Sequence, residues 1–226
     1  MEPNIKQPAQ NLNFIGMANQ HHHPLYRLLY CCTLILGLTL FNACSNLETV
    51  ETRDEQGRLE RYQRNKKDYA KEGLYQKFHP NGTLLQEAHY VHDTLHGERK
   101  YFYENGVLET VEHLRNGIYD GKFQHYYPNG VLQIEQQYVN GALQGLSVRY
   151  YKNGVIEEKV TLRDNEEDGP FTEYYENGNL KAEGAYRPSD GDPVEHGELK
   201  EYDESGQLVR IADCNNGLCL TRWKKF

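Results

Sequence analysis

Glycine recurs in this chain at a fixed interval, and that regularity restricts the fold more than any other feature. Two series of six glycines run in parallel, and in each series the steps are 24, 24, 24, 24 and 28 residues. Two coincident series with one period indicate a protein built from copies of one supersecondary unit. The series are Gly82, Gly106, Gly130, Gly154, Gly178 and Gly206, and Gly73, Gly97, Gly121, Gly145, Gly169 and Gly197.

Each repeat is predicted to be a β-hairpin, because Asn-Gly stands between two runs of strand-forming residues. Proline precedes that dipeptide at Pro80 and Pro128. In a two-residue type I′ loop this proline would occupy a strand position that must donate a hydrogen bond, whereas the second position of a type I turn suits its fixed φ. The turn is therefore predicted as type I, with its glycine left-handed in a bulge. The longer last interval falls in 187–197, which is expected to be an enlarged loop.

That turn geometry predicts which residues face each other across each hairpin. Four positions before the turn glycine the residue is aromatic, and two positions after it the residue is Leu or Ile. Such pairs contribute about 0.2–1 kcal/mol each relative to Ala–Ala. Along the array they would form one apolar ladder, expected to be the core, so Tyr126→Ala with Tyr150→Ala should destabilise the fold by a few kcal/mol. The predicted pairs are Phe78/Leu84, Phe102/Leu108, Tyr126/Leu132, Tyr150/Ile156, Tyr174/Leu180 and Tyr202/Leu208.

Strand parity places a second aromatic series on the opposite face of the sheet. The same face is expected to carry Glu87, Glu135 and Glu183, so it should be mixed and solvated. Exposed tyrosines suit recognition surfaces, although plain sheet packing is the alternative. Tyr127→Ala with Tyr151→Ala is accordingly expected to weaken partner binding at little cost in stability. The candidate binding-face residues are Tyr103, Tyr127, Tyr151 and Tyr175.

Alternate hairpins are not equivalent, since two positions follow a 48-residue period. This pattern fits either duplication of a two-hairpin unit or a different packing role for alternate hairpins. Eight residues after the turn glycine stand Tyr90, Leu114, Tyr138, Leu162 and Tyr186, and seven before it stand Tyr75, Arg99, Phe123, Ser147 and Phe171.

The segment before the repeats is predicted to be an export signal. From Leu28 to Phe41 the chain has fourteen uncharged residues, too few for a comfortable membrane span but suited to a signal-peptide core. Residues 41–44, Phe-Asn-Ala-Cys, resemble the lipobox of bacterial lipoproteins, although Leu and a small residue are commoner in the first two places. The resemblance implies lipidation of Cys44. The alternatives are a cleaved secretory signal with a chance cysteine, or an uncleaved anchor.

Two further cysteines, Cys214 and Cys219, bracket an Asn-Asn-Gly-Leu segment that fits a hairpin loop. Exported proteins meet an oxidising compartment, and cysteines facing each other across a hairpin come within disulfide reach. We therefore predict that these two cysteines bond to each other.

Charge and motifs favour a binding protein over an enzyme. The formal net charge is −8, which disfavours nucleic acid and anionic lipid surfaces as partners. The chain has no P-loop, dinucleotide fingerprint, GxSxG or HExxH motif. The side chains of His89, His92 and His96 could converge on a metal ion if these residues lay on a helix, but not on the strand and loop predicted for them. No carboxylate stands in an apolar setting that would shift its pKa toward catalysis. No catalytic residue, metal or cofactor is therefore expected.

The repeated unit has a family resemblance. Tyr-Tyr-x-Asn-Gly-x-Leu followed by Tyr/Leu-x-Asn-Gly-x-x-x-Gly is similar to the bacterial variant of the MORN repeat, over roughly 73–210. The resemblance implies an all-β fold: an elongated, twisted, single-layer antiparallel meander of about six to seven hairpin repeats. Bacterial proteins of this kind are often labelled as antitoxins, so the resemblance also implies that a cognate toxin is a candidate partner.

Together these features predict five segments and a scaffold function. The segments are a signal peptide over 1–43, with Met17 as an alternative start, a lipid-anchored tether over 44–53, a degenerate repeat over 54–72, hairpin repeats over 73–210, and a cap over 211–226. The expected function is a non-enzymatic scaffold in the bacterial cell envelope, anchored to a membrane (the outer one favoured), that binds a protein or an envelope component. The alternative is an antitoxin or immunity-type protein, which a neighbouring toxin gene would distinguish. A third alternative, a carbohydrate-processing enzyme, is disfavoured because it would need a cleft with converging carboxylates, and the sequence shows no sign of one.

Overall fold

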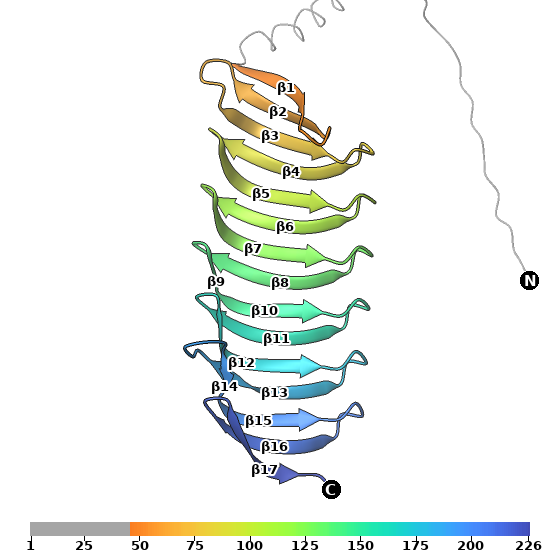
Figure 1. Ribbon diagram of the computed structural model, residues 1–226, viewed down its shortest axis with the longest axis vertical. Helices are drawn as coiled ribbons and strands as arrows, with labels where there is room; N and C mark the ends of the chain where they lie inside the picture. The colour runs from red at the N-terminus through yellow and green to blue at the C-terminus, as the bar shows by residue number, and fades with distance from the viewer. Residues whose placement is uncertain (1–45) are drawn as a thin grey trace, which may run out of the picture. The chain divides into compact units, whose positions relative to one another are not determined.

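The computed structural model describes residues 46–226, so the predicted signal peptide and Cys44 lie outside the described residues. All regular structure in this range is β, in one sheet of 17 antiparallel strands (Figure 1). No helix in this range is long and apolar enough to cross a membrane. The strands are β1 (Leu47–Arg53), β2 (Leu59–Asn65), β3 (Lys71–Phe78), β4 (Leu84–Val91), β5 (Thr94–Phe102), β6 (Leu108–Arg115), β7 (Ile118–Tyr126), β8 (Leu132–Val139), β9 (Ala142–Leu143), β10 (Gly145–Tyr150), β11 (Ile156–Arg163), β12 (Glu166–Tyr174), β13 (Leu180–Arg187), β14 (Val194–Glu195), β15 (Gly197–Tyr202), β16 (Leu208–Asn215) and β17 (Leu218–Lys224).

The chain runs through the sheet as a meander, as the resemblance of its repeats implies. Neighbouring strands in sequence pair with each other, and the short strands β9 and β14 are side branches, since β8 also pairs with β10 and β13 with β15. The expected tether over 44–53 is wrong for its second part, because residues 47–53 form β1 and pair with β2 along their whole length. The Gly57 N–H donates to the carbonyl oxygen of Asp54 at 2.9 Å, so this first hairpin closes like the later ones.

The Asn-Gly turns have the predicted geometry. In the third copy the Gly130 N–H donates to the Tyr127 carbonyl oxygen at 2.8 Å, and the Tyr127 N–H donates to the Val131 carbonyl oxygen at 2.8 Å. Gly130 has φ +84°, which confirms a left-handed residue after a type I turn. At the other edge, two-residue turns such as Asn116-Gly117 have φ of 52° and 78°, as type I′ loops require. The enlarged loop is also confirmed, since Arg187 pairs with Val194 and residues 188–193 connect them.

Gly130→Ala is expected to lower the free energy of unfolding by about 1 kcal/mol, because a residue with a Cβ disfavours positive φ. The space itself is open, since the nearest atom to an added Cβ is Val107 Cγ1 at 3.8 Å. Gly121→Ala is the contrasting variant, because its Cβ would lie 2.7 Å from His113 Cβ, and it should cost more. Urea unfolding of both variants checks the order; a neutral Gly130→Ala would contradict the strained turn.

The six predicted cross-strand pairs are confirmed, but an extra residue follows each of them. Tyr126 pairs with Leu132, whereas His125 pairs with Ile134, and the same register shift occurs at every hairpin from β3–β4 to β15–β16. A bulge of this kind reverses strand parity. The placement of Glu87, Glu135 and Glu183 opposite the ladder is therefore wrong. Gln124 Nε2 donates to Glu135 Oε2 at 2.7 Å on the ladder's own side, and the Tyr202 hydroxyl donates to Glu183 Oε1 at 2.9 Å.

The buried core lies on the face that carries Tyr103, Tyr127, Tyr151 and Tyr175, which we call the tyrosine face. The opposite side, the ladder face, carries the six aromatic–aliphatic pairs, and every residue of those pairs is only half-buried. The expectation that the ladder is the core is therefore wrong. The buried cluster consists of Val160, Leu162, Phe171, Ala182, Leu199, Ala212 and Cys214.

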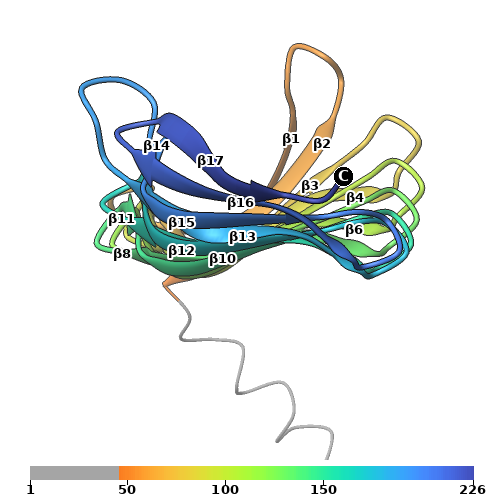
Figure 2. The same ribbon diagram turned by 90° about the horizontal axis from the view of Figure 1, so that it is seen from below.

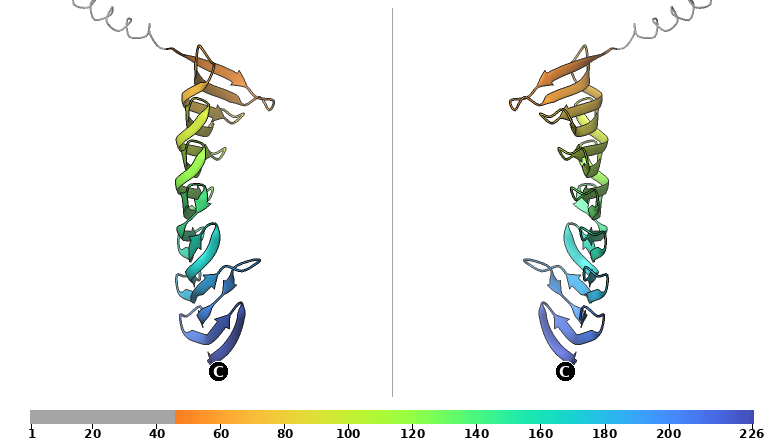
Figure 3. Two further views of the ribbon diagram at one scale, coloured as in Figure 1. Left: turned by 90° about the vertical axis from the view of Figure 1, so that its left-hand side faces the viewer. Right: turned by 90° about the vertical axis from the view of Figure 1, so that its right-hand side faces the viewer.

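Curvature of the sheet explains why the core is on that side. Seen along its length, the sheet is curved like a trough, and the connecting loops at its edges bend toward the same face (Figure 2). The loop between β13 and β14 is among them, and its residues 191–193 line a depression with Leu162, Glu167 and Tyr186 of the tyrosine face. The tyrosine face is thus the concave side, where bending brings side chains together. Figure 3 shows the sheet edge-on as a single layer, and within residues 46–226 no second sheet or helix covers either face.

The 48-residue period corresponds to a different packing role for alternate hairpins. The first, third and fifth of the six repeats carry an aromatic pair on the tyrosine face, with ring centroids 5.6, 6.1 and 4.4 Å apart. In the hairpin after the first of these pairs, Arg99 Nε instead lies 2.5 Å from Glu112 Oε2 in a buried ion pair. The three aromatic pairs are Tyr75–Tyr90, Phe123–Tyr138 and Phe171–Tyr186.

Candidate functional site

The four candidate binding tyrosines join each hairpin to the next. All four are half-buried, and each hydroxyl donates to a backbone carbonyl oxygen one repeat further on. Since these groups already have partners, the expectation that their loss costs little stability is not supported by the structure. Their use in binding stays a prediction. The bonds run from Tyr103 to Tyr126 (2.7 Å), Tyr127 to Tyr150 (3.0 Å), Tyr151 to Tyr174 (2.8 Å) and Tyr175 to Tyr202 (2.8 Å).

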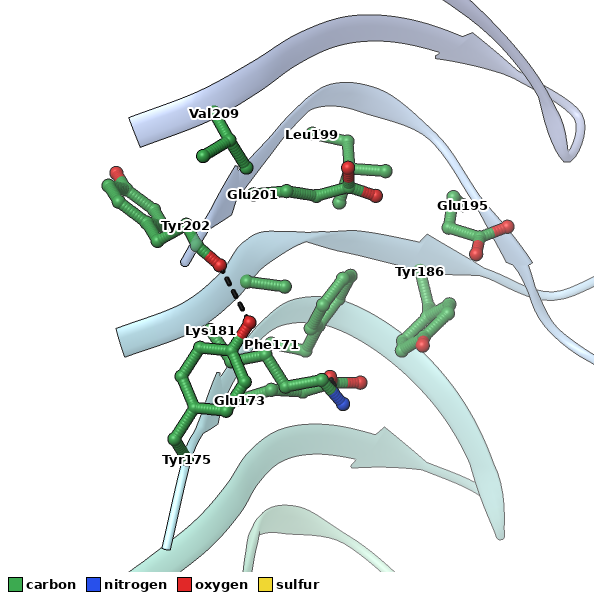
Figure 4. Close-up of a pocket in the computed structure, with 11 residues that line it drawn as sticks. Phe171, Glu173, Tyr175, Lys181, Tyr186, Glu195, Leu199, Glu201, Tyr202 and Val209 are labelled. Carbon is green, nitrogen blue, oxygen red and sulfur yellow. Dashed lines mark hydrogen bonds and ion pairs between the residues drawn. The ribbon is translucent and has the colours of Figure 1, made fainter. Parts of the chain in front are cut away.

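A hollow of about 320 Å³ opens in the tyrosine face where β12, β13 and β15 meet. In Figure 4 the rings of Phe171 and Tyr186 lie side by side at its floor, and the carboxylates of Glu173, Glu195 and Glu201 surround them. A neighbouring depression shares Tyr186 and Glu195 and adds Glu167. The concave side therefore combines an aromatic floor with an acidic rim at its C-terminal end.

Two carboxylates of this rim are not used by the fold. Glu173 pairs with Lys181 at 2.8 Å, and Glu201 pairs with Arg210 at 2.8 Å. Glu167 and Glu195 are half-buried, and neither side chain has a hydrogen bond or ion pair within residues 46–226. These two oxygen-bearing groups are free to accept a donor from another molecule.

The electrostatics of the hollow reflect burial beside several negative charges. Burial, followed by the nearby Glu167 and Glu173, raises the pKa of the Tyr186 hydroxyl to about 12. Burial also raises the pKa of the Glu158 and Glu167 carboxyls above their usual range. The trough thus desolvates carboxylates at positions that strand periodicity alone leaves exposed.

The histidine series with metal-like spacing does not converge. His89 lies on β4, His92 in the following turn and His96 on β5, and all three are exposed. Within residues 46–226 no group of three or more His, Cys, Asp or Glu side chains is placed to hold a metal ion.

Cys214 and Cys219 face each other across the β16–β17 hairpin. Their Sγ atoms lie 2.05 Å apart, at disulfide distance, and their Cα atoms 4.0 Å apart. Cys214 belongs to the buried cluster of the tyrosine face, and the residues that the cysteines flank form the predicted turn. The pair thus holds the last strand, β17, to the rest of the sheet.

Reduction of the Cys214–Cys219 bond is expected to lower the free energy of unfolding by about 2 kcal/mol, a modest value because the closed loop is short. Thermal melts with and without reductant, together with thiol titration of the purified unreduced protein, check this. Two free thiols in the unreduced protein would contradict the pairing.

Comparison with protein families explains the regularity of these hairpins. The model for the MORN repeat variant matches six segments, and the first of them spans the β3–β4 hairpin. Comparison with curated proteins gives no match. The matched residues are 71–92, 95–116, 119–140, 143–164, 167–187 and 195–213, more than half of the chain. The chain therefore belongs to the MORN repeat variant family, whose repeats are consistent with an interaction scaffold.

Proposed function

We propose that this protein is a non-enzymatic interaction scaffold whose partner binds on the concave tyrosine face. The observation that carries the proposal is the hollow between β12, β13 and β15 with its aromatic floor, together with the depression beside it. Glu195 lines both and Glu167 lines the second, and the fold uses neither carboxylate. A single-layer sheet offers an extended surface to a partner, and aromatic residues in a shaped depression are typical of the centre of such an interface. The partner is a protein or an envelope component.

The binding face can be tested with a photo-crosslinking amino acid placed on either side of the same strand pair. Gln136 lies on the tyrosine face, opposite Phe123, and Lys122 is exposed on the ladder face. We expect a defined covalent adduct in cells from position 136 and none from position 122. An adduct from position 122 alone would place the interface on the convex side and contradict the proposal.

The proposal includes a lipid anchor at Cys44 in the cell envelope, with the outer membrane favoured. It rests on the uncharged run from Leu28 to Phe41, which ends three residues before Cys44. Cys44→Ser is expected to abolish metabolic labelling with a fatty acid and to release the protein from the membrane fraction, because the acyl chains supply the membrane affinity. A variant that stays labelled and membrane-bound would show that the anchor lies elsewhere.

An antitoxin or immunity-type role is the second candidate. The acidic rim of the hollow supports it in one respect, since such a surface suits a basic protein partner. Co-expression of the chain with a toxic product of a neighbouring gene tests this role, with cell growth as the measurement. If the chain restores growth, and the Cys44→Ser variant restores it equally well, neutralisation is favoured over anchored scaffolding.

A further inference from the structure

The first repeat of the tyrosine face already holds a cation over aromatic rings. Lys71 Nζ lies 5.2 Å from the ring centroid of Tyr62, 5.4 Å from that of Tyr75 and 5.4 Å from that of Tyr90. An ammonium group within about 6 Å of a ring centroid is attracted by the negative face of the ring. The first repeat thus places a cation over its own aromatic pair.

The fifth repeat keeps the rings but not the lysine. Four repeats after the first, Phe171 takes the place of Tyr75 and Tyr186 the place of Tyr90, and Glu167 stands where Lys71 stood. The two rings are stacked: their centroids lie 4.4 Å apart, and the angle between their planes is 24°. The internal cation has been exchanged for a carboxylate, so the rings have no positive group of their own at this position.

A second carboxylate flanks the same rings from the next strand. Glu195 on β14 pairs across the sheet with Tyr186 on β13. The positive side chains of this part of the face are already engaged: Lys181 pairs with Glu173, Arg210 with Glu201, and Arg149 with Glu158 at 2.8 Å. Neither Glu167 nor Glu195 has a hydrogen bond or ion pair of this kind within the described residues 46–226, although the charge of Arg149 acts to lower the pKa of Glu167 against the larger effect of burial. The raised pKa of Tyr186 agrees with a negative surrounding of the ring.

We propose that the Phe171–Tyr186 pair, between Glu167 and Glu195, binds the cationic head of a lysine or arginine side chain from a partner protein. This inference rests on the proposed scaffold function and specifies the chemistry of its partner. Ring faces attract a cation, the two carboxylates accept its hydrogen bonds, and the hollow admits the apolar stem of the side chain. The arrangement reproduces, with an external cation, the contact that Lys71 makes inside the first repeat.

The proposal can be tested with the full chain, solubilised in detergent, and an acetylated nonapeptide of alternating lysine and glycine as the probe. Calorimetry should show binding that weakens as ionic strength rises. Glu167→Gln and Glu195→Gln should each raise the Kd about three- to tenfold. The matched control is Glu104→Gln, which removes the same charge from an exposed turn of the second repeat and should leave the Kd unchanged.

Glu167→Lys provides the sharpest variant, because it rebuilds the internal cation of the first repeat. It should abolish binding of the probe while its melting temperature stays at or above that of the native chain. Undiminished binding by Glu167→Lys, equal losses in Glu104→Gln and Glu167→Gln, or no binding by the native chain would each overturn the inference.

The same variant separates this inference from the scaffold function on which it rests. If the crosslinked adduct from position 136 persists in Glu167→Lys at the native yield, the cation site is wrong and the scaffold stands. If the native chain itself gives no adduct from position 136, the scaffold proposal fails.

Discussion

Phe171→Ala is expected to lower the free energy of unfolding of the sheet by about 3–5 kcal/mol. The Phe171 side chain is 4% exposed and is the largest side chain of the buried cluster on the tyrosine face. It fills the space above Gly184, where an added Cβ would lie 2.9 Å from Phe171 Cε1. Removing the ring would leave a cavity, because the backbone hydrogen bonds between the strands keep the sheet from closing around the empty space. Urea unfolding followed by circular dichroism measures the loss.

Phe102→Ala is the matched control, since it removes the same ring from the ladder face. Phe102 is half-buried and pairs with Leu108, so its loss should cost less than half as much as that of Phe171. An equal or larger cost for Phe102→Ala would mean that the ladder is the core after all and would exchange the roles of the two faces.

Tyr127→Ala combined with Tyr151→Ala is expected to lower the free energy of unfolding by about 4 kcal/mol. Each replacement removes a half-buried ring and a hydrogen bond that ties one hairpin to the next, to Tyr150 at 3.0 Å and to Tyr174 at 2.8 Å. In a repeat protein each unit touches only its neighbours, so the damage should be concentrated at these two junctions. Hydrogen exchange should show faster opening of β7 to β13 than of the terminal strands.

Tyr127→Phe with Tyr151→Phe separates the two contributions. Keeping the rings and removing only the hydroxyls should cost about 1 kcal/mol at each position, since each carbonyl loses one donor. If the alanine double variant unfolds at the same urea concentration as the native chain, the bridging role of these tyrosines is wrong, and they are free for the recognition role predicted from the sequence.

The sequence by itself determined the features that depend on near neighbours in the chain. Asn-Gly with Pro128 before it specifies a type I turn and a left-handed Gly130, because the conformations that proline and glycine adopt are local properties. The turn then aligns Tyr126 with Leu132, and the recurrence of the turn gives the same alignment in six hairpins. The hairpins and the register beside each turn follow from these short-range constraints, whereas the single-layer meander was implied by the resemblance to the MORN repeat.

Only the tertiary structure decided which face is the core and where a ligand can bind. The extra residue after each ladder pair moves Glu135 to the ladder side, and no local signal marks that bulge. Bending of the sheet then buries Phe171 and leaves Phe102 only half-buried, although both are phenylalanines on strands of the same sheet. The neighbourhood of Tyr186 with Glu167 and Glu195 joins three strands. Such contacts depend on the summed curvature of many strands, which strand periodicity does not encode.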